Sequence, residues 1–479
     1  MQFNILDVIA SLPEIIVFTA ATLLLIIDLF LGKGKKHIIG YISLAVILTA
    51  WVYTCKLSGA TIYAFNSMFI FDGYSSFFKM VFYLSTILAI LLSMNYIKVE
   101  DIEHGEYYIL LLFALSGMML MASGMDLISI YIGLELMAIS IYVLTGLIKQ
   151  DVRSNEAAMK YIILGALSSG ILLYGISLVY GLTGTTQLSA ISEFLKNKES
   201  IDPALLLAIV FLVAGFGFKV AAVPFHMWAP DVYEGAPTSI TAFMSVGPKA
   251  AGFAVLLRVF LDSFGSISVH WLTLISVLSV ATMVVGSIVA LVQTNIKRML
   301  AYSSIAHAGY GLLGFVAGGR DGIASVMLYM LIYAFMNMGI FGAIIVMRKG
   351  NFHGENITDY TGLAKVHKGM ALLMLIFLFS LAGIPPTAGF VAKFYVFMAL
   401  INKGFITLAI IGAVMSAVSA YFYIRIVMLM YMKEPEREFA LAQTLSTRIA
   451  LAIAVFGTVL IGVLPTWFID WAQKSVFSM

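Results

Sequence analysis

Long runs of apolar residues recur from one end of the chain to the other, and short polar segments separate them. A typical run is LLLAIVFLVAGFGF, at residues 205–218. The hydrocarbon core of a bilayer is about 30 Å thick and takes about 20 apolar residues in a helix, whereas a membrane β-barrel shows alternation. The pattern therefore predicts membrane-spanning helices. We expect fourteen, at about residues 10–32, 38–56, 75–97, 106–122, 125–147, 158–181, 204–228, 239–262, 271–293, 299–317, 322–347, 370–401, 404–432 and 448–470.

The composition fits an all-α polytopic membrane protein, with residues 1–479 as a single membrane domain. The chain is 61% hydrophobic and 11% charged, against about 25% charged residues in soluble domains. Its one cysteine, Cys55, excludes an iron–sulfur cluster or a cysteine zinc site within the chain. No phosphate-binding loop or dinucleotide fingerprint is present. We therefore expect no cofactor and no metal in this chain, and no nucleic acid as a partner.

The distribution of basic residues predicts the orientation of the chain. If the N-terminus lies outside, the inner loops contain sixteen lysines and arginines and the outer loops contain seven. Cytoplasmic loops carry the excess of basic residues in membrane proteins. We therefore expect both termini to be extracytoplasmic. Lys79 and Arg425 lie within a few turns of a predicted helix end, where a long side chain can reach the interface.

Four charged residues fall well inside predicted helices. Glu135 and Lys249 each lie about ten residues from a helix end, which is about 15 Å at 1.5 Å per residue. Lys219 lies in the middle of the seventh helix, and Lys393 lies in the second half of the twelfth. A charge at such depth costs about 2.5–3.5 kcal/mol on insertion scales. One buried lysine can be a structural partner of a glutamate or a carbonyl group, but three lysines cannot all be neutralised by one glutamate. Because burial favours neutral lysine, the set is typical of a proton relay.

Two histidines also lie within predicted helices. Imidazole exchanges protons near neutral pH. We interpret His307, in the tenth predicted helix, as a further relay residue. For His226, which follows Pro224 near the inner mouth of the seventh helix, we favour a hydrogen bond to a neighbouring helix. A haem would need paired axial ligands at matched depth, and nothing marks these two histidines as a pair.

Prolines and glycines predict breaks in two helices. Pro224 follows Gly215 and Gly217 in the seventh helix, and the twelfth contains LAGIPPTAGFVAKF at residues 381–394. Proline removes an intrahelical hydrogen bond, and non-helical backbone at this depth needs protein or water to satisfy it. An unwound turn frees carbonyl groups that a lysine ammonium can bind. We therefore expect each break and its nearby lysine to form one site.

The two breaks hold equivalent places in two sets of five helices. The seventh helix is the fourth of helices 4–8, residues 106–262, and the twelfth is the fourth of helices 9–13, residues 271–432. Because five is odd, the second set must be inverted in the membrane relative to the first. Interrupted helices in corresponding places indicate a transport site between inverted repeats. A packing kink would explain either break alone.

Three segments of the sequence resemble a known family. KVAAVPFHMWAPDVYEGAPTSITAFMSVGPKAA, SSIAHAGY and AGIPPTAGFVAKF are similar to the antiporter-like membrane subunits of respiratory NADH:quinone oxidoreductase, complex I. The form FHMWAPDVYEGAPT and the N-terminal LPEIIVFTAATLLLIIDLFL resemble the subunit N branch. The likeness covers the whole chain. It implies a proton-translocating subunit in which Glu135 pairs with Lys219, Lys249 connects them across the centre, and Lys393 stands on the exit side.

The resemblance also implies the setting of the chain. Flavin, iron–sulfur clusters and the main quinone site belong to other subunits, in agreement with the single cysteine. The expected partners are the sister antiporter-like subunits and small membrane subunits of complex I, together with the lipid of a bacterial inner membrane. Two other interpretations stay open: a subunit of a multi-subunit sodium/proton antiporter, and a structural membrane anchor with buried ion pairs.

Overall fold

The computed structural model describes residues 5–32, 34–100, 102–198, 201–348, 354–435 and 441–477. Within these residues the only regular strands form a small hairpin, in which β1 (Ile62–Ala64) pairs antiparallel with β2 (Phe69–Phe71). Lys33, Lys349 and Arg437, which the predicted orientation places in inner loops, lie outside the described residues.

The described residues otherwise fold as helices, most of them long. The α-helices are α1 (Ile5–Ala10), α2 (Leu12–Phe30), α3 (His37–Lys56), α4 (Gly73–Val99), α5 (Glu106–Ser123), α6 (Leu127–Thr145), α7 (Val152–Thr183), α8 (Leu188–Lys196), α9 (Pro203–Val220), α10 (Trp228–Gly235), α11 (Thr238–Leu257), α12 (Ser268–Leu291), α13 (Ile296–Ala317), α14 (Gly319–Met347), α15 (Leu363–Val366), α16 (Lys368–Ala382), α17 (Ala388–Asn402), α18 (Ile406–Met432), α19 (Leu445–Val463) and α20 (Thr466–Lys474). A π segment, η1 (Arg258–Ser263), and two 3-10 segments, η2 (Gly265–Ile267) and η3 (Ile357–Tyr360), complete the list.

The all-α membrane class is confirmed, and the described helices agree with about fourteen crossings. Thirteen of the described helices are long and apolar enough to cross a membrane. The pair α16 and α17, of 15 residues each, makes the remaining crossing and is interrupted at the predicted prolines. The seventh crossing differs from the prediction in its extent. Helix α9 ends at Val220 rather than near residue 228, and α10 continues the crossing to Gly235.

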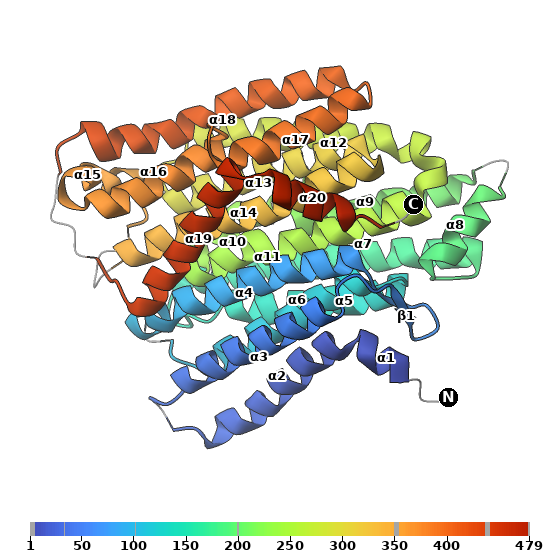
Figure 1. Cartoon of the computed structure of the whole chain (residues 1–479), viewed down its shortest axis with the longest axis horizontal. Coiled ribbons are helices and arrows are strands. Elements are labelled where there is room, and N and C mark those ends of the chain that lie inside the picture. The colour runs from blue at the N-terminus through green and yellow to red at the C-terminus, as the bar shows by residue number, and fades with distance from the viewer. Residues whose placement is uncertain are drawn as a thin grey trace.

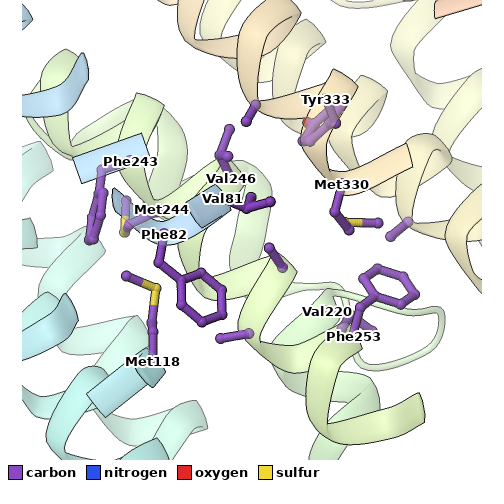
Figure 2. Packing of buried hydrophobic residues seen from close by; sticks show 14 of the residues in the cluster. Val81, Phe82, Met118, Val220, Phe243, Met244, Val246, Phe253, Met330 and Tyr333 are labelled. Carbon is purple, nitrogen blue, oxygen red and sulfur yellow. The ribbon is translucent and has the colours of Figure 1, made fainter. Parts of the chain in front are cut away.

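Helix α11 forms the centre of the bundle. Its most apolar stretch is completely buried, whereas only 28–33% of the corresponding stretches of α2, α3 and α18 is buried. Figure 1 shows α2 and α3 along one edge of the bundle and α18 along the opposite edge. Around α11, Figure 2 shows Val81 and Phe82 of α4, Met118 of α5 and Met330 of α14 in the packing that surrounds Val246.

Two helix pairs approach each other so closely that only glycine fits between them. In the α5–α6 pair, a Cβ atom on Gly117 would lie 2.5 Å from the carbonyl oxygen of Gly133. In the α12–α13 pair, a Cβ atom on Gly286 would lie 2.5 Å from the backbone nitrogen of Ala306. These pairs are the first and second helices of the two predicted five-helix sets.

The same two sets contain matching backbone bridges. Asp126, before α6, pairs with Gln187, after α7, and Asn295, before α13, pairs with Asn356, after α14. Asp126 and Asn295 also cap the helices that follow them, by accepting hydrogen bonds from the first backbone amides. Because α6 is the fifth crossing and α13 is the tenth, the two bridges lie at opposite ends of the bundle.

Two basic residues expected at the surface are buried in ion pairs. Lys79 does not reach an interface: its side chain is 0% exposed, and its Nζ lies 2.6 Å from Oε1 of Glu14 on α2. Arg258, expected in an outer loop, donates from Nη2 to both carboxylate oxygens of Asp72, at 3.0 and 2.9 Å. Loss of one partner from such a pair costs about 3–5 kcal/mol, because the other charge remains buried.

The two ends of the described chain lie in the same half of the bundle. Figure 1 shows α1 and the C-terminal end of α20 in the half that also contains α8 and the β1–β2 hairpin. An even number of crossings requires this arrangement.

Candidate functional site in the membrane

The first helix break lies between α9 and α10. Ala221 has a left-handed backbone, with φ of 58°, and the chain turns through Pro224 before α10 begins. The indole Nε1 of Trp228 donates a hydrogen bond to the carbonyl oxygen of Phe218 at 3.0 Å. We expected Lys219 to bind the carbonyls freed at this break. Trp228 has that role instead, and Lys219 makes no hydrogen bond to a described residue.

Aromatic rings surround the Lys219 ammonium, and the side chain is only 5% exposed. Its Nζ lies 5.9 Å from the ring centroid of Tyr142 on α6 and 5.7 Å from that of Phe218. Cation–π contacts contribute about 0.5–2 kcal/mol. The carboxylate that acts electrostatically on Lys219 is that of Glu135.

Glu135 projects from α6 and is partly exposed in the isolated chain. Its carboxylate accepts a hydrogen bond from Oγ of Ser169 on α7. No direct salt bridge joins it to Lys219, although both residues are described. The Glu135–Lys219 pair implied by the resemblance is therefore not a direct ion pair in this structure and stays a prediction, and Tyr142 lies beside the lysine.

Lys249 reaches from the middle of α11 to α13. Its Nζ donates to the carbonyl oxygen of Ser304 at 2.8 Å and to Ser304 Oγ at 2.7 Å. It also lies 5.9 Å from the ring centroid of Tyr233. One turn further along α11, a Cβ atom on Gly252 would lie 3.7 Å from Cβ of Lys219. The stem of Lys219 therefore packs beside the turn of α11 that follows Lys249.

His307 lies one turn along α13 from Ser304. Its Nδ1 is 2.6 Å from the hydroxyl oxygen of Tyr329 on α14, and its Nε2 is 3.2 Å from that of Tyr423 on α18. Both ring nitrogens are thus engaged, and in the neutral ring one donates while the other accepts. Lys249 and His307 line one cavity of about 10 Å³, which is about the space that one water molecule needs.

Lys393 fills the second helix break, between α16 and α17. Its Nζ donates to the carbonyl oxygens of Leu381 and Ala382, at 3.1 and 2.9 Å, and to Oγ of Ser416 at 2.9 Å. The expectation that a lysine binds the carbonyls of an unwound turn is met at this break. The ammonium also lies 5.0 Å from the ring centroid of Tyr310 on α13.

The five predicted residues lie along one series of neighbours. Glu135 acts on Lys219, whose stem packs beside α11. Lys249 and His307 share a cavity, and the ring of His307 contacts that of Tyr310, whose centroid lies 5.0 Å from Nζ of Lys393. In Figure 1 the helices that carry the series cross the bundle from α6 through α11 and α13 to α17, roughly perpendicular to the helix axes. The series therefore runs along the plane of the membrane.

His226 lies in the first break but does not join this series. It is buried, and its Nδ1 has no hydrogen bond to a described residue. The hydrogen bond that we favoured for this histidine is therefore not made by Nδ1.

Sequence reasoning missed Lys297, which it assigned to an inner loop. The side chain is 2% exposed. Its Nζ donates to the carbonyl oxygens of Glu234 and Ala236, at 2.6 and 2.8 Å, and so satisfies the C-terminal end of α10. A charged cavity of about 290 Å³ lies beside it. Nothing in the local sequence distinguishes Lys297 from the adjacent Arg298, because only the packing of α10 buries it.

The hydroxyl partners of the charged groups were also missed. Ser169, Ser304 and Ser416 each bind a charged side chain of the series, but serine is frequent in all of these helices. One signal was available in the segment SSIAHAGY. Ser304 precedes His307 by three residues, which places both on one face of a helix.

Comparison with known proteins identifies the family. The family model described as NADH:quinone oxidoreductase/Mrp antiporter, TM, matches residues 124–460. NADH-quinone oxidoreductase subunit N 2 of Rhizobium meliloti (strain 1021) is 60% identical over 468 residues, which cover 98% of this chain and 97% of that protein. The chain belongs to the NADH-quinone oxidoreductase subunit N family. Another member of the subunit N family, from Trichlorobacter lovleyi, is 44% identical over 476 residues, which cover 99% of this chain and 98% of that protein.

This member of the subunit N family shares its fold with chains of solved membrane complexes. A chain of respiratory complex I from Thermus thermophilus with bound aureothin has a TM-score of 0.81 at 29% identity, covering 96% of this chain and 98% of that one. A chain of the Mrp complex from Dietzia sp. DQ12-45-1b has a TM-score of 0.86 at 22% identity, covering 99% and 97% of the two chains. The second likeness concerns the fold alone.

Proposed function

We propose that this chain translocates protons across a bacterial inner membrane as the antiporter-like subunit N of a respiratory NADH:quinone oxidoreductase. The observation that carries the proposal is the series Glu135, Lys219, Lys249, His307 and Lys393 across the middle of an all-helical bundle. Electron transfer from NADH to quinone would take place in partner subunits that hold the flavin and iron–sulfur clusters. This chain contributes a path for protons, and its partners are the other membrane subunits of the complex.

Each residue of the series can hold a proton or transfer it to a neighbouring group. Lys249 and Lys393 carry protons on Nζ and hold them with hydrogen bonds to hydroxyl and carbonyl oxygens. His307 connects them, because a tyrosine hydroxyl at each ring nitrogen can act as donor or acceptor as the ring gains or loses a proton. A charge that arrives on one lysine repels the proton on the next, so a change at one end is felt along the series.

Glu135 is the residue of the series on which other subunits can act. Its carboxylate is partly exposed in the isolated chain, so a neighbouring membrane subunit can reach it. A change in the charge near Glu135 alters the attraction that holds the proton on Lys219. We infer that the energy of electron transfer enters the series by this route.

Protons would enter from the inner side through the charged cavity beside Lys297. Ser304, which binds Lys249, lies seven residues further along α13, two turns of the helix. Lys297 and Lys249 therefore face the same side of α13 in succession.

We also propose that residues 106–262 and 271–432 are inverted repeats. Three features support this: the matching bridges at opposite ends of the bundle, the glycine contacts in the first two helices of each set, and the interrupted fourth helix of each set. The series of charged residues crosses the bundle between the two interrupted helices, where such transporters bind their ions.

A subunit of a multi-subunit sodium/proton antiporter is the alternative function. The fold shared with the Mrp complex supports it. The higher identity to subunit N over nearly the whole chain favours the respiratory complex.

Lys249→Met tests the proposed function. Methionine has a similar length but no proton to exchange. We expect the complex to assemble in parental amounts and NADH-driven proton uptake to fall about tenfold or more, because a positioned proton-transfer group contributes about 10²–10⁴-fold to a rate. The measurement is NADH:quinone turnover and proton uptake in membrane vesicles that contain equal amounts of assembled complex.

Lys433→Met is the matched control, because Lys433 is an exposed lysine just beyond α18. It should leave turnover and proton uptake unchanged. Parental proton uptake in the Lys249→Met complex would contradict the relay. Uptake that depends on sodium in the parent would favour the antiporter function instead.

A further inference from the structure

A cavity of about 300 Å³ lies where α3, α4 and α19 meet, at the end of the bundle that the orientation places inside. Figure 1 shows the start of α19 beside α4, although the two helices are far apart in the sequence. The lining divides into a polar and an apolar part. The lining residues are Tyr41, Leu91, Met94, Asn95, Lys98, Thr444, Leu445, Ser446 and Ile449.

The polar part carries one uncompensated positive charge. Lys98 is exposed, and neither a hydrogen bond nor an ion pair joins its ammonium to any described residue. Asn95, Thr444 and Ser446 add an amide and two hydroxyl groups, and the lining contains no carboxylate. The cavity beside Lys297, by contrast, has three basic and three acidic residues in its lining. This cavity therefore attracts an anion.

The apolar part continues along the side of the bundle. Leu91 and Met94 form its buried floor, while Leu445 and Ile449, which are 75% and 43% exposed, form a wall of α19. The same cavity thus offers a cationic and hydrogen-bonding part next to an apolar part that faces the hydrocarbon of the membrane. An inorganic anion would use only the first of these parts.

We propose that this cavity binds an anionic phospholipid. The phosphate accepts hydrogen bonds from Lys98 and from the hydroxyl group of Ser446, and an acyl chain lies against Leu91, Leu445 and Ile449. Basic pockets between membrane helices on the cytoplasmic side bind anionic headgroups in this manner. A zwitterionic lipid is disfavoured, because the lining has no carboxylate for its ammonium group. The bound lipid joins the α3–α4 side of the bundle to α19, and its binding does not depend on the proton relay.

Photoactivatable lipids test the proposal on the assembled complex. The complex would be reconstituted in nanodiscs that contain either a phosphatidylglycerol or a phosphatidylcholine probe, with the photoactivatable group in the acyl chain. Labelled peptides are then identified by mass spectrometry. We expect the phosphatidylglycerol probe to label residues 91–98 and 441–449 at least threefold more than the phosphatidylcholine probe.

Lys98→Gln should reduce phosphatidylglycerol labelling of these peptides to the phosphatidylcholine level, and Lys98→Arg should restore it. The matched control is Lys149→Gln, which removes another exposed basic residue of the inner face and should leave the labelling unchanged. NADH:quinone turnover in all variants shows whether the complex is intact. Equal labelling by the two probes, or full labelling of the Lys98→Gln complex, would overturn the proposal. Displacement of the probe by inorganic phosphate, but not by chloride at equal ionic strength, would assign the cavity to free phosphate instead.

Discussion

At the scale of single residues, the three buried lysines of the series are held in three different ways. Lys393 donates three hydrogen bonds and Lys249 donates two, while the Lys219 ammonium has aromatic rings beside it and no hydrogen bond to a described residue. Hydrogen bonds to charged groups contribute about 1.5–3 kcal/mol each, and cation–π contacts contribute about 0.5–2 kcal/mol. Lys219 therefore depends most on the negative charge of Glu135.

Glu135→Gln should expose this dependence. We expect the variant complex to assemble normally and its proton uptake or its turnover to fall several-fold, because Lys219 loses its counter-charge. Glu135→Asp and Ser169→Ala keep the charge and should be milder. The assay is proton uptake per NADH oxidised in vesicles with equal amounts of complex. Glu193→Gln, which neutralises an exposed glutamate of α8, is the control, and unchanged uptake and turnover in Glu135→Gln would count against the pair.

The charged members of the site could be predicted from the sequence because a charge inside an apolar run is rare and conspicuous. The burial of Lys297 could not be predicted, since its position in the sequence indicates only the first turn of a helix beside an inner loop. The serine and tyrosine partners could not either. Which hydroxyl group binds a charged side chain depends on how the helices pack against each other, and no local sequence pattern shows this.

At the scale of elements, the two interrupted crossings satisfy the backbone carbonyls at their breaks with different residues. In the break after α16, the lysine itself binds the free carbonyls. In the break after α9, the indole of Trp228 binds the carbonyl, and Lys219 makes no hydrogen bond to a residue that the structure describes. Lys393, in the second break, thus both binds the free backbone carbonyls and belongs to the series of charged residues.

Lys393→Arg separates these two roles. Arginine can still donate to the carbonyls of Leu381 and Ala382, but it keeps its proton at physiological pH. We expect the complex to assemble and proton uptake and NADH:quinone turnover to be impaired. Lys393→Met should be impaired as well, with added instability, because each buried carbonyl left unpaired costs about 1–3 kcal/mol.

The control for Lys393→Arg is Lys403→Arg, at an exposed lysine just beyond α17. It should match the parent in thermal stability, turnover and proton uptake. Should Lys393→Arg also match the parent while Lys393→Met fails, a fixed charge is what this position supplies, and its role as a proton carrier is wrong.

Helix positions were predictable because each crossing must fill the apolar thickness of the bilayer, whatever packs against it. The end of α9 was not, because the segment AAVPFHMW stays apolar through the break. Where the helix unwinds depends on Trp228 being placed to bind the carbonyl of Phe218. That contact exists only in the folded chain.

At the scale of the whole molecule, the orientation depends on the charges that remain in loops. Lys297 was counted among the basic residues of the inner loops and Arg258 among those of the outer loops. Both are buried in the structure, so neither counts as an exposed loop residue. Fifteen basic residues then remain inside against six outside, so the asymmetry on which the orientation depends persists. The burial of these two residues, like that of Lys79, results from tertiary ion pairs and caps that loop counting cannot detect.

Reporter fusions test the orientation together with the number of crossings. With fourteen crossings and an extracytoplasmic N-terminus, alkaline phosphatase fused after Met479 should be active, because it folds only outside the cytoplasm, and a fluorescent protein that folds only in the cytoplasm should be dark there. The matched control is a fusion after Glu434, between α18 and α19, where one crossing fewer should reverse both signals. The measurement is phosphatase activity and fluorescence in whole cells, each divided by the amount of fusion protein.

If the C-terminal fusion is fluorescent and lacks phosphatase activity while the Glu434 fusion shows the reverse, the chain is inverted. The cavity beside Lys297 would then open outside rather than at the side from which protons are taken up. If both fusions give the same signal, α19 does not cross the membrane, and the number of crossings is thirteen rather than fourteen.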